Sequence, residues 1–161
     1  MRLVIADTGP LNYLILIRHI EVIPRLFDRV AVPNALQVEL SNRFAPPLVR
    51  NWIAAPPAWL EIHDSTTLPK VSGLDEGETE AIALAEFLNA DLLLIDERAG
   101  FRAAKKLGLR VTGTIGLLDL AAERGLVDFA DAIRKLSATS FRRPETLLKS
   151  LLAKHNRSTK R

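Results

Sequence analysis

Short apolar runs alternate with longer amphipathic segments along the 161-residue chain. The apolar runs predict five strands, at residues 3–7, 29–33, 59–64, 91–96 and 110–114. Helical periodicity predicts helices at residues 10–28 with a break near Arg18 and His19, and at 35–44, 46–57, 75–89, 98–108, 115–125, 128–138 and 145–155. This alternation predicts an α/β fold, with a parallel sheet covered by helices on both faces.

The chain has no internal repeat, low-complexity segment or linker, so we expect one domain. Residues 1–141 form its main part, and residues 142–161 are predicted to add a basic C-terminal helix and tail. Cysteine is absent, which excludes disulfides, thiolate metal sites and a cysteine nucleophile. No signal peptide and no apolar run of about 18 residues is visible, so we expect a cytoplasmic protein that does not cross a membrane.

The net charge of +3 conceals an uneven distribution. Residues 142–161 hold seven Lys/Arg and one Glu, a net charge of +6, and the rest of the chain has a net charge of −3. Such a segment is either a solvated tail or a contact for phosphates or an acidic partner. Its leucines at 147, 148, 151 and 152 form an apolar stripe, which favours docking onto the globule or onto a second subunit.

Two of the buried strands end on a carboxylate. Asp7 closes the run Leu3–Ala6, and Asp96 closes the run Leu92–Ile95. In open parallel sheets, ligands bind beyond the carboxyl ends of the strands, so both acids are candidates for a binding site. The alternative is that each acid caps the helix that follows it.

Two further candidate acids lie on predicted helices. Glu39 borders the buried face of a helix that carries Leu36, Leu40 and Phe44 on one stripe. Glu78 begins a helical stripe, but it also stands three residues after Asp75, as in a capping box. Glu80 leads a neighbouring stripe, and periodicity does not choose between it and Glu78.

A cluster of such acids requires protons or a cation. Two carboxylates about 4 Å apart repel by roughly 4 kcal/mol at an effective dielectric constant of 20. Oxygen ligands without cysteine or clustered histidine suit Mg²⁺ or Mn²⁺ rather than zinc. A metal held in this way activates water and stabilises a phosphoryl transition state.

Five segments carry a combined pattern: "ADTGPL", "VPNALQVEL", "LDEGETEAIALA", "LLLIDERAGFRAAKKLGLRVTGTIGLL" and "AAERGLV". Together they resemble the PIN-domain superfamily, and more narrowly its VapC-like prokaryotic branch. The resemblance runs from Leu3 to about Val127. It implies a three-layer α/β/α domain with a five-stranded, mainly parallel sheet in the order 3-2-1-4-5, which brings the first and fourth strands side by side.

The resemblance also implies roles for single residues. The catalytic acids correspond to Asp7, Glu39, Glu78 and Asp96, of which Asp7, Glu78 and Asp96 would bind the metal. Thr8 matches a small hydroxyl residue that supports the first acid, and Arg98 and Arg102 are candidate RNA contacts. Phe101 stands where relatives often have another arginine, and Asp119 stands where an aliphatic residue is usual, so Asp119 faces solvent or adds a fifth acid.

The activity that the resemblance implies is that of a Mg²⁺- or Mn²⁺-dependent endoribonuclease. Its expected partners are an RNA substrate, a cognate antitoxin protein and a second copy of the chain in a homodimer. A phosphatase of the haloacid-dehalogenase type is disfavoured because Gly9 stands where its second acid belongs. The remaining alternative is a catalytically idle PIN fold that binds nucleic acid or protein.

Overall fold

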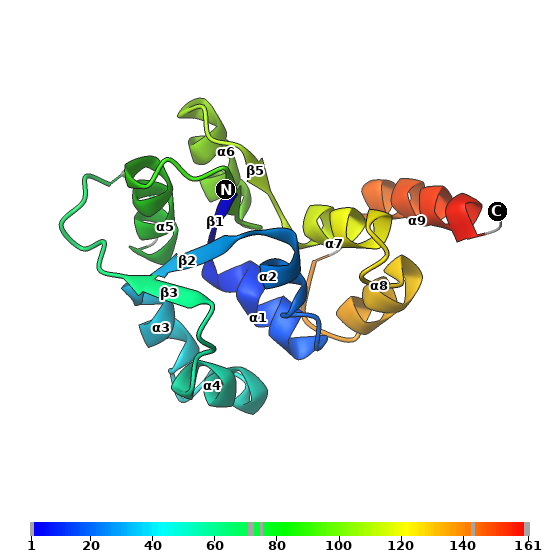
Figure 1. The fold of residues 1–161 in the computed structure, drawn as a ribbon, viewed down its shortest axis with the longest axis horizontal. Coiled ribbons are helices and arrows are strands. Elements are labelled where there is room, and N and C mark those ends of the chain that lie inside the picture. The colour runs from blue at the N-terminus through cyan, green and yellow to red at the C-terminus, as the bar shows by residue number, and fades with distance from the viewer. Residues whose placement is uncertain (1, 71–72, 75, 143, 160–161) are drawn as a thin grey trace.

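Five parallel strands form the centre of the molecule in a computed structural model, which describes residues 2–70, 73–74, 76–142 and 144–159. The sheet order is β3-β2-β1-β4-β5, and each neighbouring pair of strands is parallel (Figure 1). The strands are β1 (Leu3–Ala6), β2 (Arg29–Pro33), β3 (Leu60–His63), β4 (Leu92–Leu94) and β5 (Val111–Thr112). The predicted sheet order is therefore confirmed.

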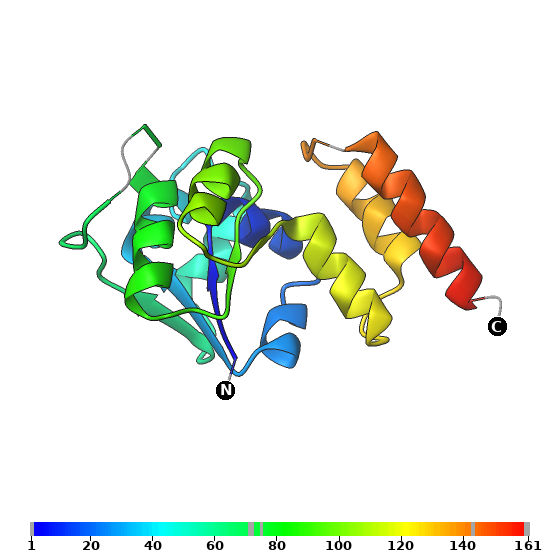
Figure 2. The ribbon, with the colours of Figure 1, turned by 90° about the horizontal axis from the view of Figure 1, so that it is seen from above.

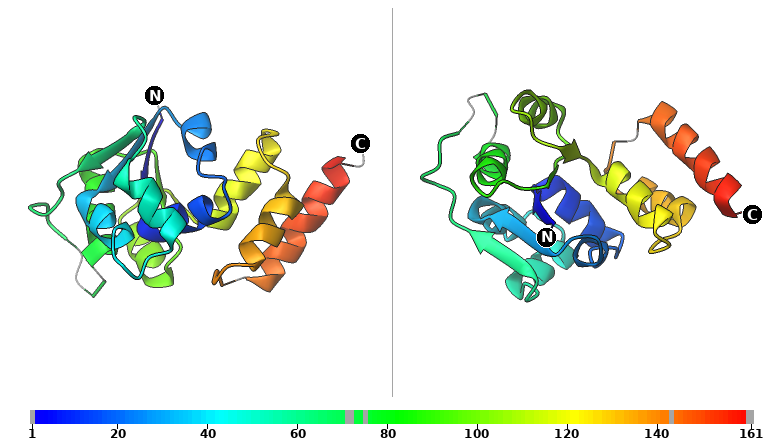
Figure 3. Two further views of the ribbon diagram at one scale, coloured as in Figure 1. Left: turned by 90° about the horizontal axis from the view of Figure 1, so that it is seen from below. Right: turned by 45° about the horizontal axis from the view of Figure 1, so that its top comes forward.

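The sheet is buried on both faces, which explains why its central strands are apolar throughout. Val4 and Ala6 of β1 belong to one core, and Leu3 and Ile5 belong to the other, because successive side chains of a strand point to opposite faces. Figures 1 and 3 show α5 (Glu76–Phe87) and α6 (Arg98–Lys106) on one side of the sheet and the first two helices on the other.

The remaining helices cover the second face and extend beyond it. They are α1 (Thr8–Leu16), α2 (Val22–Leu26), α3 (Asn34–Leu40), α4 (Pro47–Ala54), α7 (Thr114–Glu123), α8 (Phe129–Ser137) and α9 (Glu145–Thr159). The predicted break after the first helix is confirmed, since Arg18 adopts a positive φ of 63°. No helix in the described part of the chain is long and apolar enough to cross a membrane.

The predicted helix at 35–44 is shorter than expected. It ends at Leu40, so Phe44 does not continue the buried stripe of Leu36 and Leu40 and is 81% exposed. Instead the guanidinium of Arg43 lies 4.7 Å from the centre of the Phe44 ring. The expectation that Phe44 belongs to this stripe is therefore wrong.

The basic C-terminal helix docks on the molecule itself. Figure 2 shows α7, α8 and α9 packed together beside the sheet, with the C-terminus at the outer end. Leu148 of α9 is buried in the main core, whereas Leu147 is 47% exposed.

Polar contacts also hold α9 in place. Asp119 of α7 accepts a hydrogen bond from Lys154 Nζ at 2.9 Å, and His155 Nε2 lies 2.8 Å from the same oxygen. Burial alone would raise the pKa of Asp119, but the bonds from Lys154 and His155 outweigh it and lower that pKa. Asp119 is therefore a partly exposed partner of α9, with 22% of its side chain exposed, and the alternative that it joins the other acids is wrong.

Candidate active site

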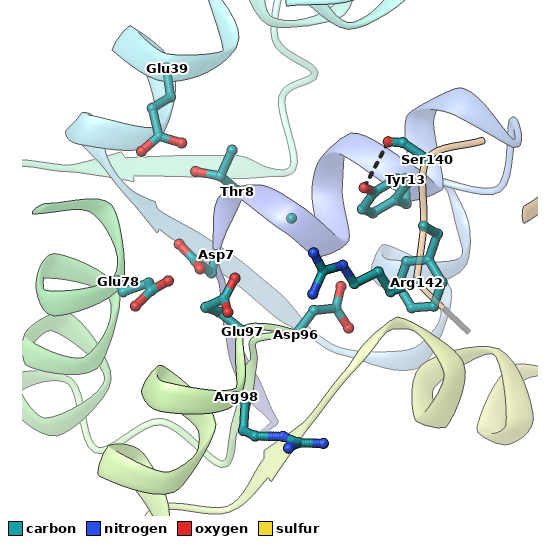
Figure 4. A pocket seen from close by; sticks show the side chains of 12 residues that line it. Asp7, Thr8, Tyr13, Glu39, Glu78, Asp96, Glu97, Arg98, Ser140 and Arg142 are labelled. Atoms are coloured by element: carbon teal, nitrogen blue, oxygen red, sulfur yellow. Dashed lines mark hydrogen bonds between the residues drawn. The ribbon is translucent and has the colours of Figure 1, made fainter. Parts of the chain in front are cut away.

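A pocket of about 850 Å³ opens beyond the carboxyl ends of β1 and β4. Its walls come from α1, α3, α5, the start of α6 and residues 140–142 after α8 (Figure 4). The lining residues are Asp7, Thr8, Gly9, Tyr13, Glu39, Glu78, Asp96, Glu97, Arg98, Ser140, Phe141 and Arg142. The pocket therefore contains the four predicted acids and lies where an open α/β sheet binds ligands.

Asp7 enters this pocket directly from β1. Its backbone N–H donates to the carbonyl of Leu94 at 2.9 Å, which continues the pairing of β1 with β4. Asp7 occupies the N-cap position of α1, yet its side chain makes no capping hydrogen bond. The alternative that this carboxylate merely caps the helix is therefore not supported by its geometry.

Asp96 is held by the first residue of α7. The backbone N–H of Thr114 donates to Oδ1 at 2.8 Å, and its hydroxyl donates to Oδ2 at 2.6 Å. Gly113 permits this approach, because a Cβ there would lie 2.6 Å from Oδ1. Burial raises the pKa of Asp96 above its usual value, and the two bonds from Thr114 offset this only in part.

The carboxylate of Asp96 also lies next to the start of α1. A Cβ placed on Gly9 would lie 3.6 Å from Asp96 Oδ2. Asp7 stands two residues before Gly9, at the adjoining strand end. The acids of the first and fourth strands therefore share one end of the pocket.

Glu78 and Glu80 lie in different surroundings although they are two residues apart on α5. Glu78 lines the pocket, and its Oε2 faces the first turn of α6, where a Cβ on Gly100 would approach it to 3.4 Å. Glu80 is 1% exposed and accepts a hydrogen bond from the Ser65 hydroxyl at 3.1 Å. Asp75, the other half of the expected capping box, is outside the described residues.

Glu39 and Thr8 complete the acidic end of the pocket. Glu39 is exposed on α3, and Figure 4 shows its carboxylate directed toward Thr8 and Asp7. The Thr8 hydroxyl oxygen is buried without a hydrogen-bond partner among the described residues. A buried hydroxyl of this kind is suited to a water or another ligand bound in the pocket.

The two predicted RNA contacts are placed differently. Arg98 lines the pocket, whereas Arg102 is exposed on α6 and is not among the lining residues that the structure describes. Phe101 packs partly buried against the core on the α5 side of the sheet, and Lys105 lies 5.4 Å from the centre of its ring. The basic character of this rim therefore comes from Arg98.

Several residues of the pocket are not marked by the sequence pattern. Glu97 lines it beside Asp96, and the acidic pair in "IDER" was the available signal. Arg142 lines the opposite wall, although it is remote in sequence from every predicted acid. Its membership of the basic tail gave no indication that it would reach this pocket.

Among the described residues, the lining is strongly acidic, with five carboxylates and two guanidinium groups. Oxygen donors are the ligands that Mg²⁺ and Mn²⁺ prefer, and these carboxylates and the Thr8 hydroxyl, which has no partner among the described residues, are all oxygen donors. However, among the described residues no three acidic or histidine side chains are arranged to hold a metal ion. Binding a cation would therefore require the carboxylates to move together.

A family model described as PIN domain matches residues 3–157 of the sequence. The chain belongs to the PIN-domain family. PIN domains are commonly nucleases, so the acidic pocket lies in a fold that commonly carries a nuclease site. No curated protein matches the sequence.

Comparison with solved structures supports the PIN fold. A PilT N-terminus domain protein from the hyperthermophilic archaeon Sulfolobus solfataricus P2 is similar to this chain with a TM-score of 0.50. The two sequences are 15% identical, and the match covers 71% of this chain and 89% of the archaeal chain. At this identity the likeness concerns the fold alone.

Proposed function

We propose that this PIN domain is a Mg²⁺- or Mn²⁺-dependent endoribonuclease. The observation that supports this most strongly is the convergence of Asp7, Glu39, Glu78 and Asp96, from four separate elements, on one pocket. In the proposal, Asp7, Glu78 and Asp96 hold the metal, and Thr8 supports them. Asp7 and Asp96 follow strand ends, and Glu39 and Glu78 come from helices, so four elements direct carboxylates into the place where an open α/β sheet binds ligands.

When bound, the metal would supply positive charge to a water nucleophile and to the phosphodiester. In the proposed reaction, the oxygen of water bonds to phosphorus, and the P–O3′ bond breaks with its electron pair going to the 3′ oxygen. That oxygen takes up a proton, so the products are a 5′-phosphate and a 3′-hydroxyl. Glu39 is exposed at the rim, so its carboxylate can accept the proton that the water loses. The two hydrogen bonds from Thr114 orient the Asp96 carboxylate in the pocket.

The resemblance to VapC-like proteins extends the proposal to a biological role. We propose that the chain is a cytoplasmic toxin, which forms a homodimer and is silenced by a cognate antitoxin protein. Such contacts need apolar surface, and Val38, Phe44 and Leu48 are exposed large hydrophobic side chains on or between α3 and α4. The toxin role predicts growth arrest on expression, relieved by Asp7→Asn.

A second candidate is a catalytically idle PIN fold that binds nucleic acid or protein. It is favoured by the absence, among the described residues, of three side chains already arranged to hold a metal. The two functions differ in one respect that is simple to measure. An idle module would bind its partner equally well with and without a divalent cation.

The proposal is tested by cleavage of a labelled single-stranded RNA in Mn²⁺ and in EDTA. The wild-type chain should cut only with the metal, and Asp7→Asn should abolish cutting while the circular dichroism spectrum is unchanged. Glu86→Gln is the matched control, because Glu86 is an exposed acid of α5 that does not line the pocket. Cleavage by Asp7→Asn at the wild-type rate would refute the assignment.

A further inference from the structure

Residues 140–142, which follow α8, form the wall of the pocket opposite Glu39 and Glu78. Ser140, Phe141 and Arg142 line the same pocket as Asp7 and Asp96, although they lie more than forty residues further along the chain than Asp96. Figure 4 shows the Arg142 side chain extending from this segment toward Asp96 and the acidic end. A residue of the C-terminal region therefore belongs to the pocket.

Several contacts fix the position of this segment. The hydroxyls of Tyr13 and Ser140 form a hydrogen bond of 3.1 Å. The rings of Tyr13 and Phe141 meet edge to face, with their centres 5.0 Å apart and their planes at 87°. The backbone N–H of Phe141 also donates to Thr139 Oγ1 at 3.2 Å. The backbone immediately before Arg142 is therefore anchored to α1 and to the end of α8.

The guanidinium of Arg142 is available for a ligand. Arg142 is exposed, and no ion pair joins it to a carboxylate of the described residues. Its planar group carries five N–H donors in a fork that matches the oxygens of a phosphate. An arginine that borders carboxylates without pairing to them is well placed to bind an anion lying across the pocket.

We propose that Arg142 binds a phosphate of the RNA backbone beside the metal site. This inference rests on the proposed ribonuclease function and adds to it a substrate-binding residue from the C-terminal segment. The acidic lining repels a polyanion, and Arg142 and Arg98, which line the same pocket, supply positive charge there. Arg142 positions the strand, and the acids act on the scissile bond.

The proposal predicts a specific kinetic change for Arg142→Gln. A contact that is equally strong in the bound substrate and in the transition state changes KM and leaves kcat intact. Loss of a charged hydrogen bond to phosphate should raise KM about tenfold, while kcat changes by less than about threefold. Arg142→Lys keeps the positive charge but loses the forked set of N–H donors. Its KM should therefore lie between those of the wild type and Arg142→Gln.

The test measures KM and kcat on a short mixed-sequence RNA with Mn²⁺, and the salt dependence of binding to that RNA with Ca²⁺. Arg142→Gln should reduce the salt slope by about 0.7 log units per log unit of salt. Arg124→Gln is the matched control, because Arg124 is an exposed arginine at the end of α7 that does not line the pocket. It should behave as wild type. Circular dichroism and Mn²⁺ titration check that both variants keep the fold and the metal affinity.

Two results would overturn the proposal while the ribonuclease function stands. One is an active wild-type enzyme for which Arg142→Gln and Arg124→Gln are indistinguishable. The other is a rise in activity and Mn²⁺ affinity in Arg142→Gln, which would make Arg142 an internal plug of the acid site. A wild-type chain that neither binds nor cleaves RNA would overturn the proposed function itself, and this inference with it.

Discussion

Thr114 donates two hydrogen bonds to Asp96, one from its backbone N–H to Oδ1 and one from its hydroxyl to Oδ2. The pair joins the end of β4 to the first residue of α7, and Thr114 is fully buried. Each carboxylate oxygen retains a second lone pair, so Asp96 is oriented by the protein and can still accept another ligand. A partly buried charge held in this way is typical of sites that sacrifice stability for function.

The first prediction is that Asp96→Asn stabilises the metal-free protein. The raised pKa means that the folded state disfavours the ionised carboxyl, so this group destabilises the fold above its folded-state pKa. Asparagine removes the charge, can accept from the Thr114 N–H, and can donate to its hydroxyl. Stability at neutral pH should rise by about 0.5–2 kcal/mol.

The pH dependence gives this prediction a clear sign. The difference in the free energy of unfolding between Asp96→Asn and wild type should be largest at neutral pH. It should shrink as the pH falls toward about 4, the pKa of an aspartate in the unfolded chain. Urea unfolding of both proteins in EDTA at several pH values measures this difference. The same variant should bind Mn²⁺ at least tenfold more weakly, as expected for a lost ligand. Lower stability with unchanged Mn²⁺ affinity would show that Asp96 is only structural.

The second prediction separates the neighbouring acids of α5. Glu78→Gln should reduce RNA cleavage by about 100-fold or more, because Glu78 faces the pocket and is a proposed ligand. Glu80→Gln should cleave normally, since Glu80 is directed toward Ser65 and lies outside the pocket lining. The comparison uses initial rates with saturating Mn²⁺. The reverse order of effects would reassign the ligand to Glu80.

The third prediction concerns the pair of Arg29 and Glu61 at the β2–β3 edge. Arg29 donates two hydrogen bonds to Glu61 at 2.8 and 2.9 Å, and these lower the pKa of Glu61 to about 2, against a smaller opposing effect of burial. The pair therefore stabilises the fold above pH 4.5, and this contribution is lost as the pH falls toward 2.

Thermal melting of Glu61→Gln tests the pH window. Both side chains are partly exposed, so the melting temperature should fall by no more than about 2–4 °C at neutral pH. The difference from wild type should diminish below pH 4.5. A difference that grows on acidification would contradict the assignment of the stabilising form to the carboxylate.

The fourth prediction uses two adjacent leucines of α9. Leu148 is 4% exposed and Leu147 is 47% exposed. Leu148→Ala should therefore destabilise the protein by about 2–3 kcal/mol, and Leu147→Ala should change stability by no more than about 0.5 kcal/mol. Equal effects in urea unfolding would mean that α9 does not dock through Leu148 in solution.

The sheet was predictable because both of its faces are buried. Continuous apolar runs such as Leu92–Ile95 mark the strands, and Asp7 and Asp96 mark the ends where the chain turns outward. The family resemblance then supplied the sheet order that brings the two ends together. The apolar runs and the acids that end them are both local in sequence.

The missing parts of the site depend on tertiary contacts. Thr114 meets Asp96 across eighteen positions of sequence, and no local pattern marks a partner at that distance. Arg142 reaches the pocket because Tyr13 packs against Phe141, which only the arrangement of α8 and α9 decides. Phe44 was misplaced because α3 ends four residues earlier than its apolar spacing suggested.

A crystal soaked in Mn²⁺ shows whether the acids of this pocket hold a divalent cation. The anomalous scattering of manganese locates the ion without any assumption about activity. We expect a peak within coordination distance of Asp7, Glu78 and Asp96, with these carboxylates drawn closer together than in the metal-free structure. The absence of a peak in the pocket at a saturating Mn²⁺ concentration, or a peak only at another site, would show that these acids do not form a metal site.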